Sequence, residues 1–381
     1  MQIPRSFETA AGDAASADEG PDVSRRLVLA AGAASALMAT GCVTPPDLPP
    51  HACPSREPAT VVTPPNTQAT IVDMQKAAKL QARTAMSNRS LIAAEIGPFA
   101  IKVQGGTTPA SLSAAEQARQ QELSTLNSDL AKNEDALRER VVAGLRRKAA
   151  CTASGALWND QTGVGPSTVT LYRGGATQKV FETIEIPGAS LETIQDSIFH
   201  MRTDPQRLEQ IELQVKFPHV YLAAALSADA RVLAEPNLVN WTCQAINCVG
   251  WFATALVIDL KCDLLVPRPR VISKEAPRPI IAMPDYSSYP GGHAAFLAAL
   301  YVVLMDITGA NPTQALQFRG LPERIAENRE RAGLHTRVDT RAGWEFGTAL
   351  GQAMLRWVNV NDDPNDIDWA VIYKSAKAEW S

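Results

Sequence analysis

The sequence predicts a mainly α-helical protein, a helical bundle that carries one small β-hairpin. Long stretches rich in Ala, Leu, Glu and Arg place apolar residues three and four positions apart, the period of an amphipathic helix. Two short runs of β-branched and aromatic residues near 168–186 are typical of strands. With 381 residues, 45% of them hydrophobic and 20% charged, the chain has a globular composition and enough length for a large core.

Residues 1–42 are predicted to be a targeting sequence. Arg25 and Arg26 precede a small, apolar run that ends at Ala39, and this pattern resembles a twin-arginine export signal. The run of about 14 residues is too short to span a bilayer. The residues up to Cys42 resemble a lipoprotein cleavage site, which makes Cys42 a candidate membrane tether. We therefore expect an exported protein, periplasmic or lipid-anchored in the bacterial envelope.

Two segments separate this signal from the main domain. Residues 43–68 are rich in Pro and Thr and are predicted to form a linker. Residues 69–150 read as helical, with Ser113 and Glu116 at the spacing of a capping box. We expect 69–150 to be a helical hairpin or arm that packs on the main domain, and a partner-binding coiled coil is the alternative.

Residues 151–381 are predicted to form the main helical domain. The strand-like runs Thr168–Tyr172 and Val180–Ile186 are separated by a glycine pair and predict the hairpin. From Leu191 onward the pattern is helical again, and the strongly apolar stretch Trp241–Leu265 predicts a buried helix.

The charges and cysteines exclude several classes of protein. A net charge of −4 argues against a general nucleic-acid binder, so any positive potential must be local. No apolar run reaches the roughly 18–20 uncharged residues that a membrane-spanning helix needs.

Cys243 and Cys248 lie five residues apart, and neither a nearby His nor another Cys pair completes a zinc site. A local disulfide or two buried thiols is the expectation.

The first of three short motifs lies at the end of the apolar stretch. Lys261 interrupts it, and Arg268 follows seven residues later, about two helical turns on. Pro267 and Pro269 are expected to end the helix and place Arg268 in a turn or extended segment. A single Lys in this position more often reaches solvent than serves a function.

The second motif runs from Tyr289 to His293. Gly291 and Gly292 stand just before an apolar stretch that predicts a helix, and free N–H groups at a helix start bind anions. Glycine also lets a ligand approach the backbone closely. His293 opens this helix and can exchange a proton near neutral pH. Without the other motifs, a glycine pair here would be read as a plain turn.

The third motif contains Arg329, His335 and Asp339. The last two are four residues apart and would share one face of a helix. Asp339 could then accept a hydrogen bond from one ring nitrogen of His335 and leave the other nitrogen nucleophilic. Together the three motifs offer three cations, two imidazoles and one carboxylate, a set that suits a phosphate-like oxyanion.

These motifs resemble the signature of the type-2 phosphatidic acid phosphatase/vanadium-dependent haloperoxidase superfamily. That signature is Lys, six residues, Arg-Pro; then Pro-Ser-Gly-His; then Ser-Arg, five residues, His, three residues, Asp. Residues 261–269, 289–293 and 328–339 match its order and its gap lengths. The resemblance covers about 240–350 and implies a helical bundle of the acid phosphatase/vanadium haloperoxidase type, with 151–381 as the catalytic domain.

The resemblance also implies how the oxyanion would be held. Lys261, Arg268 and Arg329 would bind its oxygens, Gly291 and Gly292 would line the same oxyanion site, and the backbone N–H of Gly292 would add a donor. Gly291 stands where the superfamily usually has Ser, so one hydroxyl donor is missing. A hydrogen bond to a charged group contributes about 1.5–3 kcal/mol, so the remaining donors could still bind the oxyanion.

The catalytic roles follow in the same way. The resemblance implies that His335 forms a phosphohistidine in a phosphatase or binds vanadium in a haloperoxidase. Asp339 would orient His335, and His293 would be the acid–base residue. Asn328 replaces the Ser that usually precedes Arg329, a milder change because the side chain stays polar.

The first expectation is an exported phosphatase that hydrolyses a small phosphomonoester through a phosphohistidine and needs no cofactor. The alternative is a vanadate-dependent haloperoxidase that uses hydrogen peroxide and a halide. Both use nearly the same site, because vanadate mimics the phosphoryl transition state. A third alternative is an envelope lipoprotein whose helical arm binds a partner and whose site has decayed.

Overall fold

The computed structural model describes most of the chain from residue 97 onward. The described residues are 97–101, 111–128, 136–146, 148–153, 158–173, 179–198, 207–208, 210–211, 214, 221–222, 225–226, 241–284, 286–359 and 367–380. The predicted signal at 1–42, with Cys42, and the predicted linker at 43–68 lie outside these residues.

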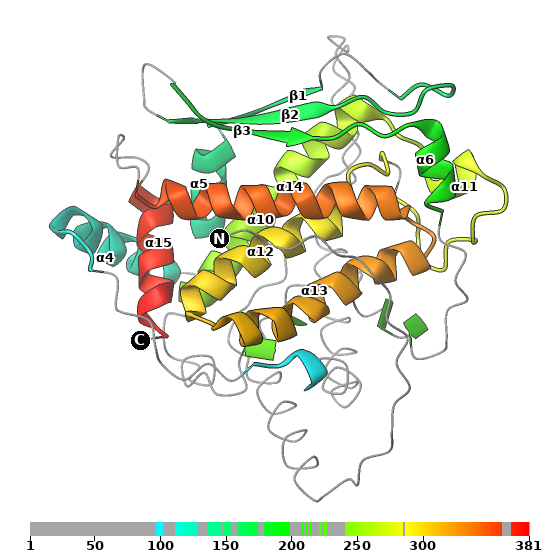
Figure 1. Cartoon of the computed structure of the whole chain (residues 1–381). Coiled ribbons are helices and arrows are strands. Elements are labelled where there is room, and N and C mark those ends of the chain that lie inside the picture. The colour runs from blue at the N-terminus through cyan, green and yellow to red at the C-terminus, as the bar shows by residue number, and fades with distance from the viewer. Residues whose placement is uncertain are drawn as a thin grey trace, which may run out of the picture.

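This part of the chain is mainly helical and contains a three-stranded antiparallel sheet (Figure 1). The sheet forms one layer, α14 lies beneath it, and α13 lies on the opposite side of the helical layer. The elements are η1 (Gly97–Phe99), α4 (Ala114–Ser128), α5 (Ala136–Arg146), β1 (Ala149–Ala153), β2 (Ser167–Arg173), β3 (Lys179–Ile186), α6 (Leu191–Asp196), α10 (Trp241–Leu264), α11 (Pro269–Ile272), α12 (Gly292–Thr308), α13 (Pro312–Arg331), α14 (Arg337–Trp357) and α15 (Ile367–Ala378).

Helix α12 is the centre of the domain. It packs against α10, α13, α14 and α15. Its sequence is apolar on nearly every side, and Leu297, Leu300 and Leu304 have no exposed surface. A helix that is apolar all round is stable only when other elements cover it, which explains its position. Gly309 ends it in the left-handed conformation, with φ of 65°.

Small residues bring α12 and α14 unusually close together. A Cβ atom added to Gly347 would lie 1.9 Å from the carbonyl oxygen of Ala295. One added to Gly343 would lie 2.2 Å from the carbonyl oxygen of Gly291, and one added to Gly351 would lie 2.9 Å from that of Ala299. Three glycines at four-residue spacing therefore let the α14 backbone touch the α12 backbone along two turns.

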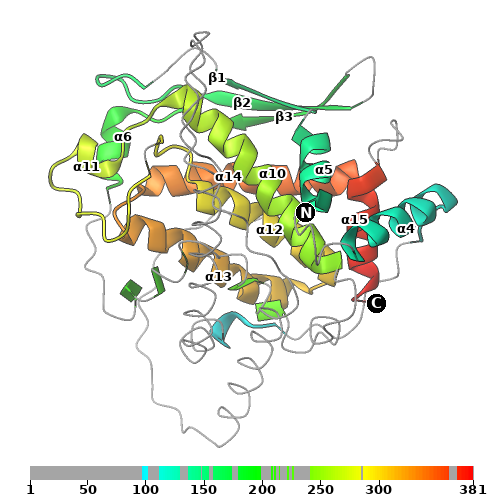
Figure 2. The same cartoon turned by 180° about the vertical axis from the view of Figure 1, so that it is seen from behind.

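The sheet covers the helices through one apolar face. Residues alternate between buried and partly exposed along β2, so that Val169 and Leu171 point toward the helices. Strand β1 packs on α10 and β3 packs on α14. Seen from behind, α10 runs from the sheet toward α15 (Figure 2). Trp357 of α14 joins these layers, since it stacks on Phe181 of β3 at 5.8 Å and contacts Phe252 of α10.

The predicted mainly helical fold and the hairpin are confirmed, the hairpin as β2 and β3. Strand β1 was not predicted, and the helical pattern that we extended to about residue 150 ends at Arg146. The predicted boundary at 150/151 falls inside β1, which pairs Cys151 with Val169. The β1 sequence Ala-Ala-Cys-Thr-Ala has little intrinsic preference for a strand, so its pairing with β2 decides its conformation.

The two helices before the sheet pack on the main domain. Helix α4 contacts α15, and α5 contacts α10. The predicted capping box begins α4: the Ser113 N–H donates to Glu116 Oε2 at 2.8 Å, and the Glu116 N–H donates to Ser113 Oγ at 3.3 Å. Glu116 also binds Lys374 of α15 at 2.7 Å, and Arg119 binds Asp368 of the same helix at 2.5 Å. Charged contacts thus hold this face of α4 against α15.

The cysteines differ from the local pairing that the sequence suggested. Cys243 and Cys262 are each disulfide-bonded, whereas Cys248 is a buried thiol outside any disulfide. Both expectations for this pair, a Cys243–Cys248 disulfide and two buried thiols, are therefore wrong. Within the described ranges, no helix combines the length and the apolar character needed to cross a membrane.

We expect Gly347→Ala to destabilise the fold by about 3 kcal/mol or more, because the new methyl group would overlap the Ala295 carbonyl. Gly250→Ala is the matched control: it also lies in a helix, but its Cβ would have no atom within 4 Å. That change should stabilise the protein by up to about 1 kcal/mol through helix propensity. Urea unfolding measures both, and equal unfolding free energies for the two variants would contradict the close contact.

Candidate active site

The predicted site residues lie at or beside the ends of four helices. Lys261 is in the last turn of α10 and Arg329 in the last turn of α13. His293 is in the first turn of α12, and Asp339 is in the first turn of α14. Electrostatic interactions link these groups to one another and to the two remaining residues, Arg268 and His335. The structure therefore brings together residues that are up to 78 positions apart (339 − 261).

Lys261 is buried rather than directed to solvent. Its side chain is 2% exposed, and Nζ donates to the carbonyl oxygens of Ser287 at 2.8 Å and Ser288 at 2.6 Å. Burial, and next the neighbouring Arg268, hold the pKa of this ammonium well below its usual range, while Asp339 acts in the opposite sense. A bound anion would remove much of this electrostatic cost.

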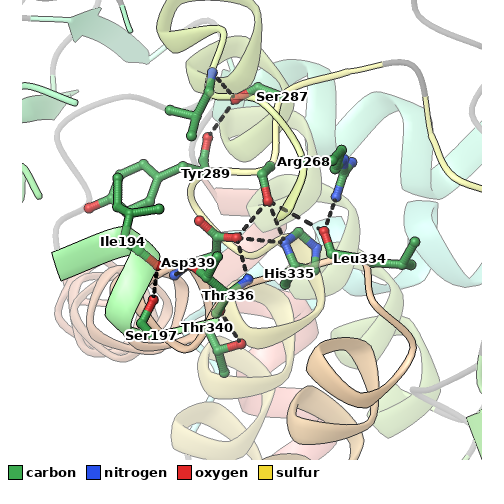
Figure 3. A network of polar contacts seen from close by, with 12 residues as sticks. Ile194, Ser197, Arg268, Ser287, Tyr289, Leu334, His335, Thr336, Asp339 and Thr340 are labelled. Carbon is green, nitrogen blue, oxygen red and sulfur yellow. Dashed lines mark hydrogen bonds and ion pairs between the residues drawn. The ribbon is translucent and has the colours of Figure 1, made fainter. Parts of the chain in front are cut away.

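Arg268 sits between α10 and α11 with an extended backbone, as the flanking prolines predicted. Its Nε donates to the Tyr286 carbonyl at 3.2 Å, and Nη1 donates to the Leu334 carbonyl at 2.9 Å (Figure 3). Nη2 is buried without a hydrogen-bond partner among the described residues. The guanidinium lies 5.4 Å from the Tyr286 ring centre, within cation–π range. Two backbone carbonyls thus fix this cation and leave one nitrogen for a ligand.

Arg329 is held from the other side of the site. It is 1% exposed, and Nη2 donates to the Ile211 carbonyl at 2.8 Å. The neighbouring Asn328 donates to Gln214 Oε1 at 2.8 Å and accepts from Arg207 at 2.5 Å. Arg207, Ile211 and Gln214 therefore support Arg329 and the adjacent Asn328, and no motif near them in the sequence indicated this role.

His293 is a neutral, half-buried base whose Nε2 is covered by the surrounding protein. The backbone of Gln214 hydrogen-bonds its ring, and Nε2 has no hydrogen-bond partner among the described residues. The bond to Gln214 must therefore use Nδ1–H, and Nε2 keeps its lone pair. Burial, then the charges of Arg329 and His335, keep the pKa of His293 well below its ordinary value. The ring packs on Phe296 with centres 5.5 Å apart.

His335 and Asp339 meet without sharing a helix. The chain leaves α13 through Gly333, which has φ of 75°, and α14 begins only at Arg337. The side chains approach because Thr336 and Asp339 form a capping box, in which Thr336 N–H donates to Asp339 Oδ2 at 2.7 Å. His335 Nδ1 then lies 3.4 Å from the same carboxylate oxygen (Figure 3). The helix start, rather than a helical face, orients the pair.

The surrounding charges keep His335 neutral and Asp339 ionised. Burial, together with the charges of Arg268 and Lys261, lowers the pKa of His335 to about 4, although the hydrogen bond to Asp339 acts in the opposite sense. For Asp339, burial raises the pKa, but hydrogen bonds from His335 and other donors outweigh it and the net pKa is lowered. His335 is therefore an unprotonated nitrogen base across the neutral pH range.

Two further residues of the site were not predicted. Ser288 is buried, and its hydroxyl donates to Asp339 Oδ2 at 2.5 Å. Tyr286 places its ring beside both Arg268 and Lys261, 5.6 Å from the Lys261 nitrogen. Both precede the second motif in sequence. Their signal was weak, because a Tyr-Ser-Ser-Tyr run in a proline-rich segment is typical of any turn.

Gly291 is required by close backbone contact. Its N–H donates to the Asp339 carbonyl at 2.7 Å, and an added Cβ would lie 2.9 Å from that same oxygen. A serine at this position would therefore push the start of α12 away from α14. Gly292 has more room, since its Cβ would meet only Lys261 and Val257 side-chain atoms at 3.8 Å. The absence of a hydroxyl at 291 thus has a steric explanation.

The donors suit an oxyanion better than a metal cation. In the described part of the chain, no three His, Cys, Asp or Glu side chains are placed to hold a metal ion. Among the residues that the structure describes, Arg268 Nη2 and His293 Nε2 are buried and lack hydrogen-bond partners, although buried polar atoms are nearly always hydrogen-bonded. An oxyanion oxygen could accept a hydrogen bond from Arg268 Nη2, whereas His293 Nε2 could donate to it only once the imidazole is protonated.

No protein-family model matches the chain, and no curated protein matches it.

The buried histidines predict a loss of stability in acid. His335 titrates near 4 in the folded protein and near 6.5 when unfolded, so the unfolded chain binds more protons between these values. Stability should therefore fall as the pH drops through this window, by about 3 kcal/mol from His335 alone. Urea unfolding of the native protein and His335→Gln at several pH values isolates the effect. Parallel pH curves for the two proteins would contradict it.

Gly291→Ser tests the steric explanation for the missing hydroxyl. Although serine is usual at this position in the superfamily that the motifs resemble, we expect the change to lower the unfolding free energy by about 1–3 kcal/mol and to weaken vanadate binding. Gly292→Ala is the control for stability, because its added methyl group fits without a clash. Thermal unfolding and calorimetric titration with vanadate measure the two effects. Tighter vanadate binding by Gly291→Ser would show that the backbones separate easily.

Proposed function

We propose that this protein is a phosphatase that hydrolyses a small phosphomonoester through a phosphohistidine at His335. The observation that carries the proposal is the neutral, buried His335, whose Nδ1 lies 3.4 Å from Asp339 Oδ2 and which has Lys261 and Arg268 beside it. Its Nδ1 faces Asp339, so Nε2 has the free lone pair that a nucleophile needs. The targeting sequence expected at residues 1–42 would place this activity in the bacterial envelope.

The cations supply the electrostatic part of catalysis. Lys261 and Arg268 share one carboxylate, Asp339, which compensates only one of their two positive charges. A phosphoryl group would bring the missing negative charge to cations that are buried and already fixed by backbone carbonyls. Preorganised donors of this kind stabilise the charge on the equatorial oxygens in the transition state.

The chemistry takes place in two balanced steps. His335 Nε2 attacks phosphorus, the P–N bond forms as the P–O bond to the leaving group breaks, and the alcohol departs with a proton. Water then attacks phosphorus, the P–N bond breaks, and inorganic phosphate leaves with His335 restored. Each displacement needs one proton to move, to the leaving oxygen in the first step and from water in the second.

His293 is suited to move that proton. In the free protein it is unprotonated, mainly because it is buried and also because of Arg329 and His335. A bound phosphate dianion favours the protonated imidazole, because an opposite charge nearby raises a pKa. His293 would therefore take its proton together with the substrate, or receive it from a monoanionic substrate, and pass it to the leaving oxygen.

The test uses the full chain and an aryl phosphate. We expect hydrolysis that micromolar vanadate inhibits, and an alkali-stable phosphoryl group on His335 after rapid quenching in base. His335→Ala should lose activity by about a thousandfold or more, and Asp339→Asn by at least about a hundredfold. Asp368→Asn is the matched control, a buried carboxylate that pairs with Arg119 on another helix.

Other outcomes distinguish the alternatives. Peroxide-dependent halide oxidation by the vanadate-loaded protein, without phosphate hydrolysis, would contradict the proposal and favour the haloperoxidase. If neither activity is present and His335→Ala changes nothing that can be measured, the site has decayed and the lipoprotein with a helical interaction arm becomes the better account.

A further inference from the structure

Ser288 lies directly behind the proposed nucleophile. It precedes α12 and is 1% exposed. Its hydroxyl oxygen lies 2.5 Å from Asp339 Oδ2, 3.4 Å from His335 Nδ1 and 3.4 Å from the Leu334 carbonyl. No role for this residue follows from the phosphatase mechanism described above, which uses His335, Asp339 and His293.

The hydroxyl has one proton, and the distances show where it goes. The contact with Asp339 is the shortest, and the carboxylate can only accept, so Ser288 donates to Oδ2. The lone pairs of Ser288 Oγ then remain for His335 Nδ1. Two acceptors, the carboxylate and the hydroxyl, therefore face the same ring nitrogen at 3.4 Å.

Asp339 alone has only a weak effect on which ring nitrogen of His335 carries the proton. Its Oδ2 already accepts from Thr336 N–H at 2.7 Å and from Ser288 at 2.5 Å, both much closer than His335 Nδ1. A separation of 3.4 Å is longer than the 2.7–3.2 Å of an ordinary N–H···O bond. The second acceptor therefore matters for which ring nitrogen carries the proton.

The backbone of Ser288 is firmly placed. Its carbonyl accepts from Lys261 Nζ at 2.6 Å, and its N–H donates to the Val266 carbonyl at 2.8 Å. The residue thus connects the cation of the first motif to the His–Asp pair of the third. Because both backbone groups of Ser288 are hydrogen-bonded, the residue has little freedom to move. Its hydroxyl can therefore fix the position of the Asp339 carboxylate.

We propose that Ser288 is a positioning residue that, together with Asp339, keeps the proton of His335 on Nδ1 and leaves Nε2 free to attack. The inference rests on the proposed phosphatase function, because only a nucleophilic His335 needs this tautomer.

The tautomer can be measured without any enzyme assay. In the full chain labelled with ¹⁵N-histidine, long-range ¹H–¹⁵N spectra identify which ring nitrogen is protonated, and only five histidines contribute. Loss of one signal in His335→Gln assigns it. We expect Nδ1–H in the native protein, and in Ser288→Ala a roughly tenfold lower ratio of Nδ1–H to Nε2–H, the effect of about 1.4 kcal/mol.

Kinetics give a second, independent measurement. Ser288→Ala should lower kcat for the aryl phosphate about tenfold while KM changes less than about twofold, because the oxyanion-binding cations are intact. The double variant Ser288→Ala/Asp339→Asn should lose no more than Asp339→Asn alone, since both act through His335. Ser375→Ala, which removes a buried hydroxyl that binds Gln120 on another helix, should change neither the tautomer nor kcat.

The possible failures are distinguishable. If the chain hydrolyses no phosphate ester, the proposed function fails, and the spectra still decide whether Ser288 controls the tautomer. If His335 carries its proton on Nε2 in the native protein, the role of Ser288 is overturned even when Ser288→Ala does not fold. An unchanged tautomer in a folded Ser288→Ala, or additive losses in the double variant, would overturn it as well.

Discussion

The site depends on the backbone contact between α12 and α14. Gly291, at the start of α12, donates to the Asp339 carbonyl, and Gly343 of α14 lies against the Gly291 carbonyl one turn further on. A larger residue at either glycine would separate the helix starts that carry His293 and Asp339. Because backbone atoms touch, the separation of these two functional groups is set by atoms that cannot change rotamer.

Backbone carbonyls also hold the buried cations Lys261 and Arg268 in place without neutralising their charge. Lys261 and Arg268 together bind four carbonyl oxygens, from Tyr286, Ser287, Ser288 and Leu334. Carbonyl dipoles fix the positions of these cations but leave their net positive charge, whereas carboxylates would cancel it. Burial, assisted by this remaining positive charge, keeps the pKa of the neighbouring His335 below its usual range. In the proposed phosphatase, the same contacts would serve both the bound anion and a neutral, nucleophilic His335.

The sequence indicated the parts of the site that are local. Apolar periodicity predicted α10 and α12, the prolines predicted the extended backbone at Arg268, and motif spacing identified the charged residues. It could not show that His335 lies outside α14, because a four-residue spacing fits two positions on one helical face and equally fits the residue before an N-cap and the third residue of the helix. Ser288 and the residues near Gln214 act only through contacts made in the folded chain, so no local pattern identified them.

Positions 288 and 291 differ in the room that each leaves for a side chain. At 291 the contact with Asp339 leaves no room for a side chain, so a hydroxyl that would face the oxyanion is sterically excluded. Three residues earlier, Ser288 has a buried hydroxyl that faces the carboxylate instead of the oxyanion. In the proposed phosphatase, oxyanion binding would then depend on the cations and backbone N–H groups, and the Ser288 hydroxyl would act on the His335–Asp339 pair. The close packing that leaves no room for a side chain at 291 thus also holds Asp339 where the Ser288 hydroxyl can bind it.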